Sequence, residues 1–160
     1  MRVFAVAACL AALTACGSTA FEAGRQCTMM AGVRGVNVGI EPPYAARVAT
    51  AAMQVCWGTT CRASEVELLP STDSVPQPCK GEVCSAQMTP TGGKTGLAQI
   101  GDLPQAPIAI TLTLKDKAGK RLLRQKVATT AKMSEPNGPG CGGGAPYAGV
   151  TVRDGKVTAQ

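Results

Sequence analysis

The chain has 160 residues, of which 45% are hydrophobic, 3% aromatic and 16% charged, and its formal net charge is +6. Because it contains no histidine, a serine or cysteine nucleophile would lack the usual imidazole base, and we expect no enzymatic activity. The Lys and Arg residues are scattered rather than clustered, which argues against nucleic acid as a partner.

The first residues have the pattern of an export signal. Met1 and Arg2 provide a positive start, an apolar run follows over residues 3–13, and small residues precede Cys16. The apolar run is too short to span a bilayer, which takes about 20 residues. We therefore predict a signal peptide over residues 1–15. An ordinary secretory signal with a chance cysteine is the alternative, although no plain A-x-A cleavage site is evident.

The motif Leu13-Thr14-Ala15-Cys16 resembles the lipobox of bacterial lipoproteins. The resemblance implies cleavage before Cys16, a lipid on the Cys16 sulfur, and a protein held on the extracytoplasmic face of the cell membrane. Residues 16–26 then form the lipidated cysteine and a small, polar tether. The remaining residues, 27–160, are enough for one domain with a single core.

Six cysteines remain in this domain, an even number that predicts three disulfides in an exported protein. The segments 56–61 and 79–84 share the pattern C-x-G-x-x-C, which suits a hairpin loop whose flanking residues face each other. The predicted pairs are Cys56 with Cys61, Cys79 with Cys84, and Cys27 with Cys141. A nested alternative, Cys56 with Cys84 and Cys61 with Cys79, stays open.

Neither cysteine unit predicts a cofactor. Structural zinc sites accept similar cysteine spacings, but the compartment oxidises thiols and the chain has no histidine. Disulfide-exchange enzymes usually carry C-x-x-C, which does not occur here.

The first half of the domain shows the two-residue period of β-strands. Val36, Val38 and Ile40 share one face of a strand that ends at Pro42-Pro43. Over residues 47–57 alternation places Trp57 inward and Cys56 outward, and Cys61 follows on the outer face of the next strand. Residues 70–78 contain three prolines and no period, so we predict a loop there, followed by short strands over 85–89 and 96–100.

The second half contains the clearest hairpins. Residues 108–114 alternate strictly and turn at 116–119 into a partner strand over 121–130. In that partner, Gln125 falls on the apolar face, which indicates a bulge or an edge strand. A Gly/Pro loop over 134–146 carries Cys141, and a hairpin with an Asp154-Gly155 turn closes the chain. Seven or so short strands predict an all-β sandwich, immunoglobulin-like or transthyretin-like.

Three apparent motifs do not predict chemistry. Residues 138–143 match G-x-G-x-x-G, but neither the strand before nor the helix after that a dinucleotide site needs is predicted. Gly93-Lys94-Thr95 lacks the first glycine of a phosphate loop, so we interpret both segments as turns. Glu65 and Glu67 lie two apart on one strand face, which is typical of a solvated surface rather than of carboxylates facing each other across a cleft.

The whole chain looks like the small β-sandwich lipoproteins, of uncharacterised function, of high-GC Gram-positive bacteria. The resemblance rests on Leu13-Thr14-Ala15-Cys16, on Cys56-Trp57 and on residues 136–141, PNGPGC. It implies an envelope-anchored module and supplies neither an activity nor a ligand.

Two functions follow as hypotheses. The first is a non-catalytic binding or scaffold module that engages an envelope protein or glycan, with Trp57, Tyr44 and Tyr147 as candidate contacts because aromatic side chains offer large contact areas. The second is handling of a soft metal such as Cu(I), which prefers thiolate and thioether ligands. Its ligands would come from Cys27, Met29 and Met30 with Met53, Met88 or Met133. Free thiols would distinguish the two hypotheses.

Overall fold

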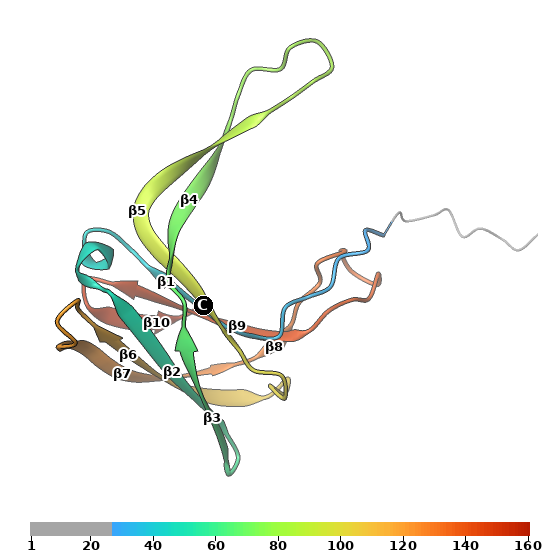
Figure 1. The fold of residues 1–160 in the computed structure, drawn as a ribbon. Coiled ribbons are helices and arrows are strands. Elements are labelled where there is room, and N and C mark those ends of the chain that lie inside the picture. The colour runs from blue at the N-terminus through green and yellow to red at the C-terminus, as the bar shows by residue number, and fades with distance from the viewer. Residues whose placement is uncertain (1–26) are drawn as a thin grey trace, which may run out of the picture.

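A computed structural model describes residues 27–160. The signal, Cys16 and the tether lie outside the described residues. Within these described residues the fold is all-β, and the one helical element there is the 3-10 turn η2 (Tyr44–Arg47) (Figure 1). The strands are β1 (Gly35–Ile40), β2 (Thr50–Trp57), β3 (Thr60–Val66), β4 (Leu69–Pro76), β5 (Ala86–Gln99), β6 (Pro107–Lys115), β7 (Arg121–Thr130), β8 (Lys132–Met133), β9 (Pro146–Arg153) and β10 (Lys156–Ala159).

The strands form two sheets that enclose one core. The larger sheet has the order β10-β9-β1-β5-β4, with β8 paired to β9, and the smaller has the order β3-β2-β6-β7. The strands pair antiparallel except β1 and β9, which run parallel. The prediction of an all-β, two-sheet fold with three disulfides is confirmed.

The core is built from the alternate residues that the sequence pattern places inward. Val36 and Val38 of β1 and Leu112 and Leu114 of β6 are fully buried. Met53 and Val55 of β2 are buried with them, and Trp57 packs against the core while remaining partly exposed. Among residues 27–160 no polar or charged residue is classed as buried, so the interior is held by apolar packing and backbone hydrogen bonds.

The cysteines pair as predicted. Cys56 and Cys61 are directly opposed on β2 and β3 and form a disulfide, and Cys79 bonds Cys84 across the short bridge between Lys80 and Val83. Cys27 bonds Cys141, 114 residues away. The nested pairing is not adopted.

The predicted loop over residues 70–78 is wrong, because β4 occupies residues 69–76. Proline cannot donate a hydrogen bond, yet it is tolerated on an edge strand where alternate N–H groups face solvent. β4 is such an edge strand of the larger sheet, and Pro70 and Pro76 both lie in it. The prolines therefore hid the sequence pattern of a strand over these residues but did not prevent the strand from forming.

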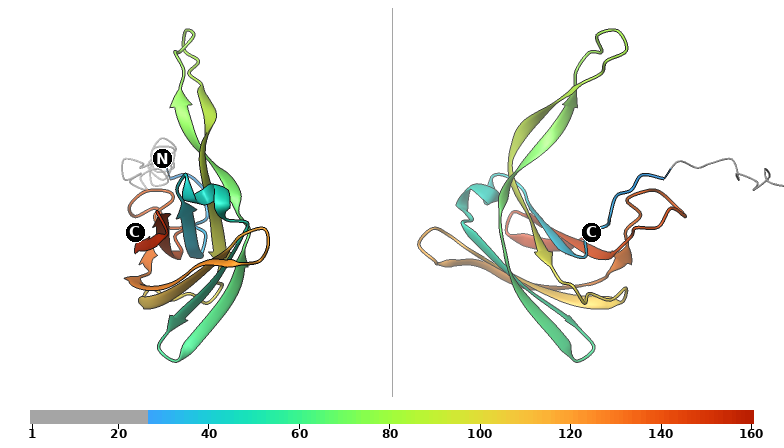
Figure 2. Two further views of the ribbon diagram at one scale, coloured as in Figure 1. Left: turned by 90° about the vertical axis from the view of Figure 1, so that its left-hand side faces the viewer. Right: turned by 45° about the vertical axis from the view of Figure 1, so that its right-hand side comes forward.

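The two short strands predicted over 85–89 and 96–100 are also wrong, because a single strand, β5, covers Ala86–Gln99. Gly93-Lys94-Thr95, predicted as a turn, lies inside it. One end of β5 pairs with β1 and the other with β4. At Gly92 φ is +78°. The part of β5 that precedes Gly92 pairs with β4 in a two-stranded arm (residues 72–91), which stands clear of both sheets in Figure 2.

The chain passes from the smaller sheet to the larger between β3 and β4. Val66 is paired with Ala51 in the smaller sheet, and Leu69 is paired with Thr95 in the larger one. The crossing lies against Gly96: a Cβ added there would lie 2.5 Å from the Glu67 carbonyl oxygen and 2.6 Å from Val66 Cγ1. A strand that switches sheets in this way forms a corner of a sandwich.

Candidate functional site

The described residues contain one large groove, of about 920 Å³, on the outer face of the larger sheet. It has a floor from β1, β5 and β9, a first wall from β3 and β4, and a second wall from the segment before β1 and the loop after β8. Its size lies at the upper end of the range for ligand pockets, about 300–1,000 Å³.

The floor is made by residues that alternate with the core. Because Val36 and Val38 point inward, Asn37 between them points out into the groove. Leu97 of β5 alternates in the same way with buried Ala98 and is half-buried. Tyr147 of β9 completes the floor and is 46% exposed.

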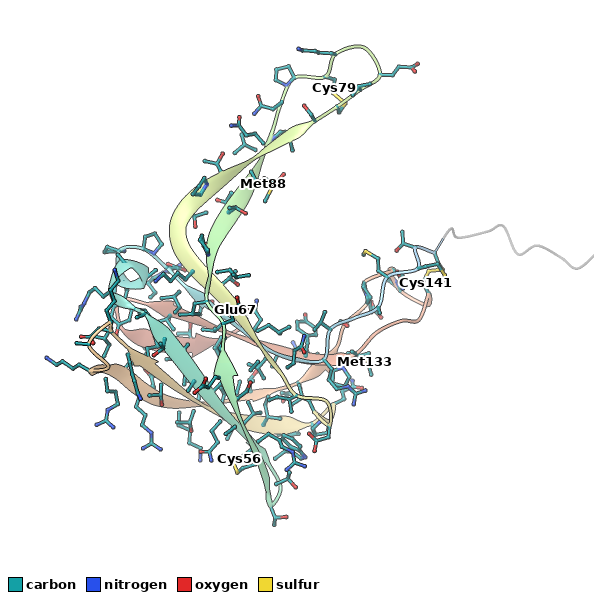
Figure 3. All side chains as sticks on the ribbon, viewed as in Figure 1. Cys56, Glu67, Cys79, Met88, Met133 and Cys141 are labelled. Carbon is teal, nitrogen blue, oxygen red and sulfur yellow. A yellow bond between two sulfur atoms is a disulfide. The ribbon has the colours of Figure 1, made fainter. Side chains whose placement is uncertain are left out.

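The first wall carries two carboxylates beside an apolar side chain. Ser64 and Glu65 come from β3, Glu67 from the crossing between the sheets, and Leu69 from β4. Glu65 and Glu67 are both exposed. Figure 3 labels Glu67 on this wall, which exists because Gly96 lets the crossing approach β5 closely.

The second wall consists of residues 31–33 together with Ser134 and Pro136. Asn137 ties its two parts together: its amide donates to the Met30 and Gly142 carbonyls, at 2.8 and 3.0 Å. The Cys27–Cys141 disulfide crosses between the same two segments. Ser134 also exchanges hydrogen bonds with Ala145, so this wall is fixed although it lacks regular structure.

The three aromatic candidates do not come together. Tyr147 lies in the groove. Tyr44 is half-buried in η2, donates to the Leu122 carbonyl at 3.4 Å and lies 5.5 Å beneath the Arg47 guanidinium. Trp57 packs on the core beside the Cys56–Cys61 disulfide. Tyr147 is thus the aromatic candidate that belongs to the groove.

Sequence reasoning missed most of the groove. Glu65 and Glu67 were interpreted as part of a solvated strand face, and Asn37 and Leu97 carried no signal. Their outward position was predictable for β1 and β3 from the period of two. Their neighbourhood was not, because it depends on the crossing at Gly96 and on the two segments joined by Asn137.

The site offers little to a metal ion. All six cysteines within 27–160 are in disulfides, and this part of the chain has no group of three or more Cys, Asp or Glu side chains placed to hold a metal. Of the methionines proposed as Cu(I) ligands, Met53 is in the core, whereas Met29, Met30, Met88 and Met133 are exposed. Without thiolates, the Cu(I) hypothesis loses its strongest ligands.

Comparisons with known proteins found no matching family model, no matching curated protein and no matching solved structure. The described residues include no helix long and apolar enough to cross a membrane. Three disulfides in one small domain are typical of a protein that works outside the cytoplasm.

Proposed function

We propose that this protein is a non-catalytic binding module of the cell envelope, anchored to the outer face of the membrane through a lipid on Cys16, and that the groove receives its partner. The observation that carries the proposal is the exposure of apolar side chains along the groove. Val33 and Leu69 are each 54% exposed, and Tyr147 is 46% exposed. Ligand sites are typically concave and lined mainly by apolar side chains with a few polar groups among them.

The rigidity of the groove supports the same proposal. Its floor belongs to a sheet whose other face is the core, and its second wall is closed by a disulfide and by the Asn137 side chain. A preformed site loses less conformational entropy on binding than a mobile one.

The lipobox residue and the second wall are close in sequence. Cys16 precedes Cys27 by eleven residues, a segment that spans at most about 40 Å when fully extended. An anchor at Cys16 would therefore keep the groove within reach of the membrane surface and of other envelope proteins.

Site-directed photo-cross-linking in the producing bacterium tests this function. A photoreactive amino acid replaces Tyr147 in the groove or, as a control, Lys117, which is exposed in the turn between β6 and β7. We expect a discrete cross-linked product from position 147 that is absent from position 117. A Leu97→Arg change, which fills the groove, should abolish that product. Equal products from both positions, or a product that survives Leu97→Arg, would contradict the proposal.

A Cys16→Ser variant tests the anchor separately. The proposal requires the natural chain to carry a lipid adduct that the variant lacks, with the three disulfides present in both. A variant with the same adduct as the natural chain would show that the lipid is not on Cys16.

A further inference from the structure

We infer that the groove binds a peptide segment that carries Lys or Arg beside apolar side chains. This inference rests on the binding function proposed above and names the chemistry of the partner. It follows from the charges on the first wall, from the position of the nearby cations, and from the apolar floor.

Within residues 27–160 the carboxylates of Glu65 and Glu67 have no hydrogen-bond or ion-pair partner. They are two residues apart in the sequence, and both line the groove. The ion pairs found within residues 27–160 are Arg62 with Asp102 and Arg153 with Glu41. No hydrogen bond within the described residues reaches either of the two groove carboxylates.

Within residues 27–160 no Lys or Arg forms an ion pair with either of these carboxylates. The groove lining contains no Lys or Arg, although the chain has a formal net charge of +6. Arg34 donates to the Gly101 carbonyl, and Lys94 donates to the Val48 carbonyl.

Two further basic residues lie near the groove. Arg124 lines, together with Glu65, a second hollow on the outer face of the smaller sheet, and three strand spacings separate these two residues. Lys132 belongs to the opposite side of the groove. It is paired with Tyr147 on β8, and three strand spacings of about 4.8 Å separate β8 from β5. The resulting distance of about 14 Å exceeds the Debye length at physiological ionic strength, about 8 Å. The first wall therefore presents to the groove two carboxylates that no salt bridge within residues 27–160 neutralises.

The rest of the lining favours a peptide over a glycan. Leu69 and Leu97 are aliphatic and suit apolar side chains, whereas sugar rings are usually held by aromatic platforms. Tyr147 is the one aromatic residue in the lining. A phosphate-bearing glycan would in addition be repelled by Glu65 and Glu67. The inferred peptide therefore places apolar side chains on the floor of the groove and Lys or Arg side chains at the first wall.

Selection from a library of random short peptides tests this inference, because it requires no assumption about the natural partner. The target is the natural full-length protein extracted from membranes in detergent, which retains every residue of the groove. We expect the selected peptides to be enriched in Lys or Arg together with apolar residues, and to bind more weakly as ionic strength rises.

Matched variants assign the enrichment to the groove. For a selected peptide, Glu65→Gln with Glu67→Gln should weaken binding by about fivefold or more, as expected for two exposed ion pairs. Asp73→Asn with Glu82→Gln changes the net charge equally, but both of these residues lie in or at the tip of the exposed arm. This second pair should leave binding unchanged.

The outcomes separate the inference from the function on which it rests. Peptides without basic enrichment that are still lost on Leu97→Arg would overturn the cationic preference and leave a binding groove. Basic peptides whose binding is unchanged by both Leu97→Arg and the glutamate substitutions would overturn the groove as the binding site. A library that yields no binder, alongside a cross-link from position 147, would overturn the peptide and favour a glycan.

Discussion

Asn137 holds Met30 through both backbone polar groups of that residue. The Asn137 amide donates to the Met30 carbonyl at 2.8 Å, and its Oδ1 accepts from the Met30 N–H at 2.9 Å. The same oxygen accepts from the Thr28 hydroxyl at 2.6 Å. The Asn137 side chain thus satisfies both backbone hydrogen-bonding groups of Met30 in the second wall, as a neighbouring strand would in a sheet.

Replacing Asn137 with alanine should loosen this wall without unfolding the domain. We expect amide exchange at Met30 to accelerate by about tenfold, because one net hydrogen bond is worth about 1 kcal/mol and the substitution removes several that act together. Hydrogen exchange followed by mass spectrometry measures the change. Asn137→Asp keeps the acceptor for the Met30 N–H and should give an intermediate rate, while unchanged exchange in Asn137→Ala would refute this role of Asn137.

A methyl group at Gly96 should destabilise the fold. The added Cβ would lie within 2.6 Å of both Glu67 and Val66, so the crossing between the sheets must shift. Forcing extra atoms into a packed site costs about 1–3 kcal/mol, and we expect Gly96→Ala to lower the free energy of unfolding by that amount in urea titrations. Gly39→Ala is the matched strand control, because a Cβ there meets no atom within 4 Å. Equal losses in the two variants would contradict the close approach.

The disulfides should contribute very differently to stability. The Cys27–Cys141 bond closes a separation of 114 residues, for which the chain-entropy model gives roughly 4–5 kcal/mol. We expect Cys27→Ser with Cys141→Ser to lose most of that free energy of unfolding. The Cys79–Cys84 bond closes a separation of 5 residues at the tip of the exposed arm. Its removal should speed hydrogen exchange in the arm and leave the main unfolding transition nearly unchanged.

The ion pair between Glu41 and Arg153 should make a pH-dependent contribution. Hydrogen bonds from Arg153, 2.5 and 2.8 Å long, lower the pKa of the Glu41 carboxyl below its ordinary value of 4.5. A carboxyl with a lowered pKa in the folded state stabilises the fold above its unfolded pKa and loses that contribution as pH falls through the folded value.

Glu41→Gln isolates this contribution. We expect the variant to be less stable than the natural chain near neutral pH and equally stable once the carboxyl is protonated, below its lowered pKa. Thermal unfolding across pH measures the difference, with Glu82→Gln at the arm tip as the control. A difference that grows on acidification would have the wrong sign for this pair.

The elements that could be predicted from the sequence are those whose signal is local. β1, β2 and β6 follow strict alternation, and the Cys56–Cys61 disulfide follows from a tight hairpin. β4 escaped prediction because proline suppresses the pattern on an edge strand where it is tolerated. β5 was divided in two because its glycines, which permit the bend and the crossing, resemble turn residues.

Gln125 shows the same limit in β7. Its inward position indicated a bulge or an edge strand, and both are present: β7 ends the smaller sheet, and the register shifts before Lys115 pairs with Arg121. What the sequence could not show is its partner. The Gln125 side chain donates to the Val157 carbonyl at 3.1 Å and accepts from the Val157 N–H at 3.0 Å, joining the edges of the two sheets.

The groove could be predicted least, because it depends on contacts between segments distant in sequence. Tyr147 was singled out for its position beside a glycine-rich loop, but nothing local connects it with Glu67, 80 residues earlier in the chain. Strand order and the crossing at Gly96 place them around one groove.

The intact mass of the protein extracted from membranes tests the account most directly, because every proposal above assumes an exported chain anchored at Cys16 and closed by three disulfides. Iodoacetamide is added before and, in a parallel sample, after reduction, and fragmentation assigns the sites. The account predicts a lipid adduct on Cys16, no alkylation before reduction, and alkylation of the six cysteines that form Cys27–Cys141, Cys56–Cys61 and Cys79–Cys84 afterwards. A Cys16 without lipid, or alkylation of Cys27 before reduction, would contradict it.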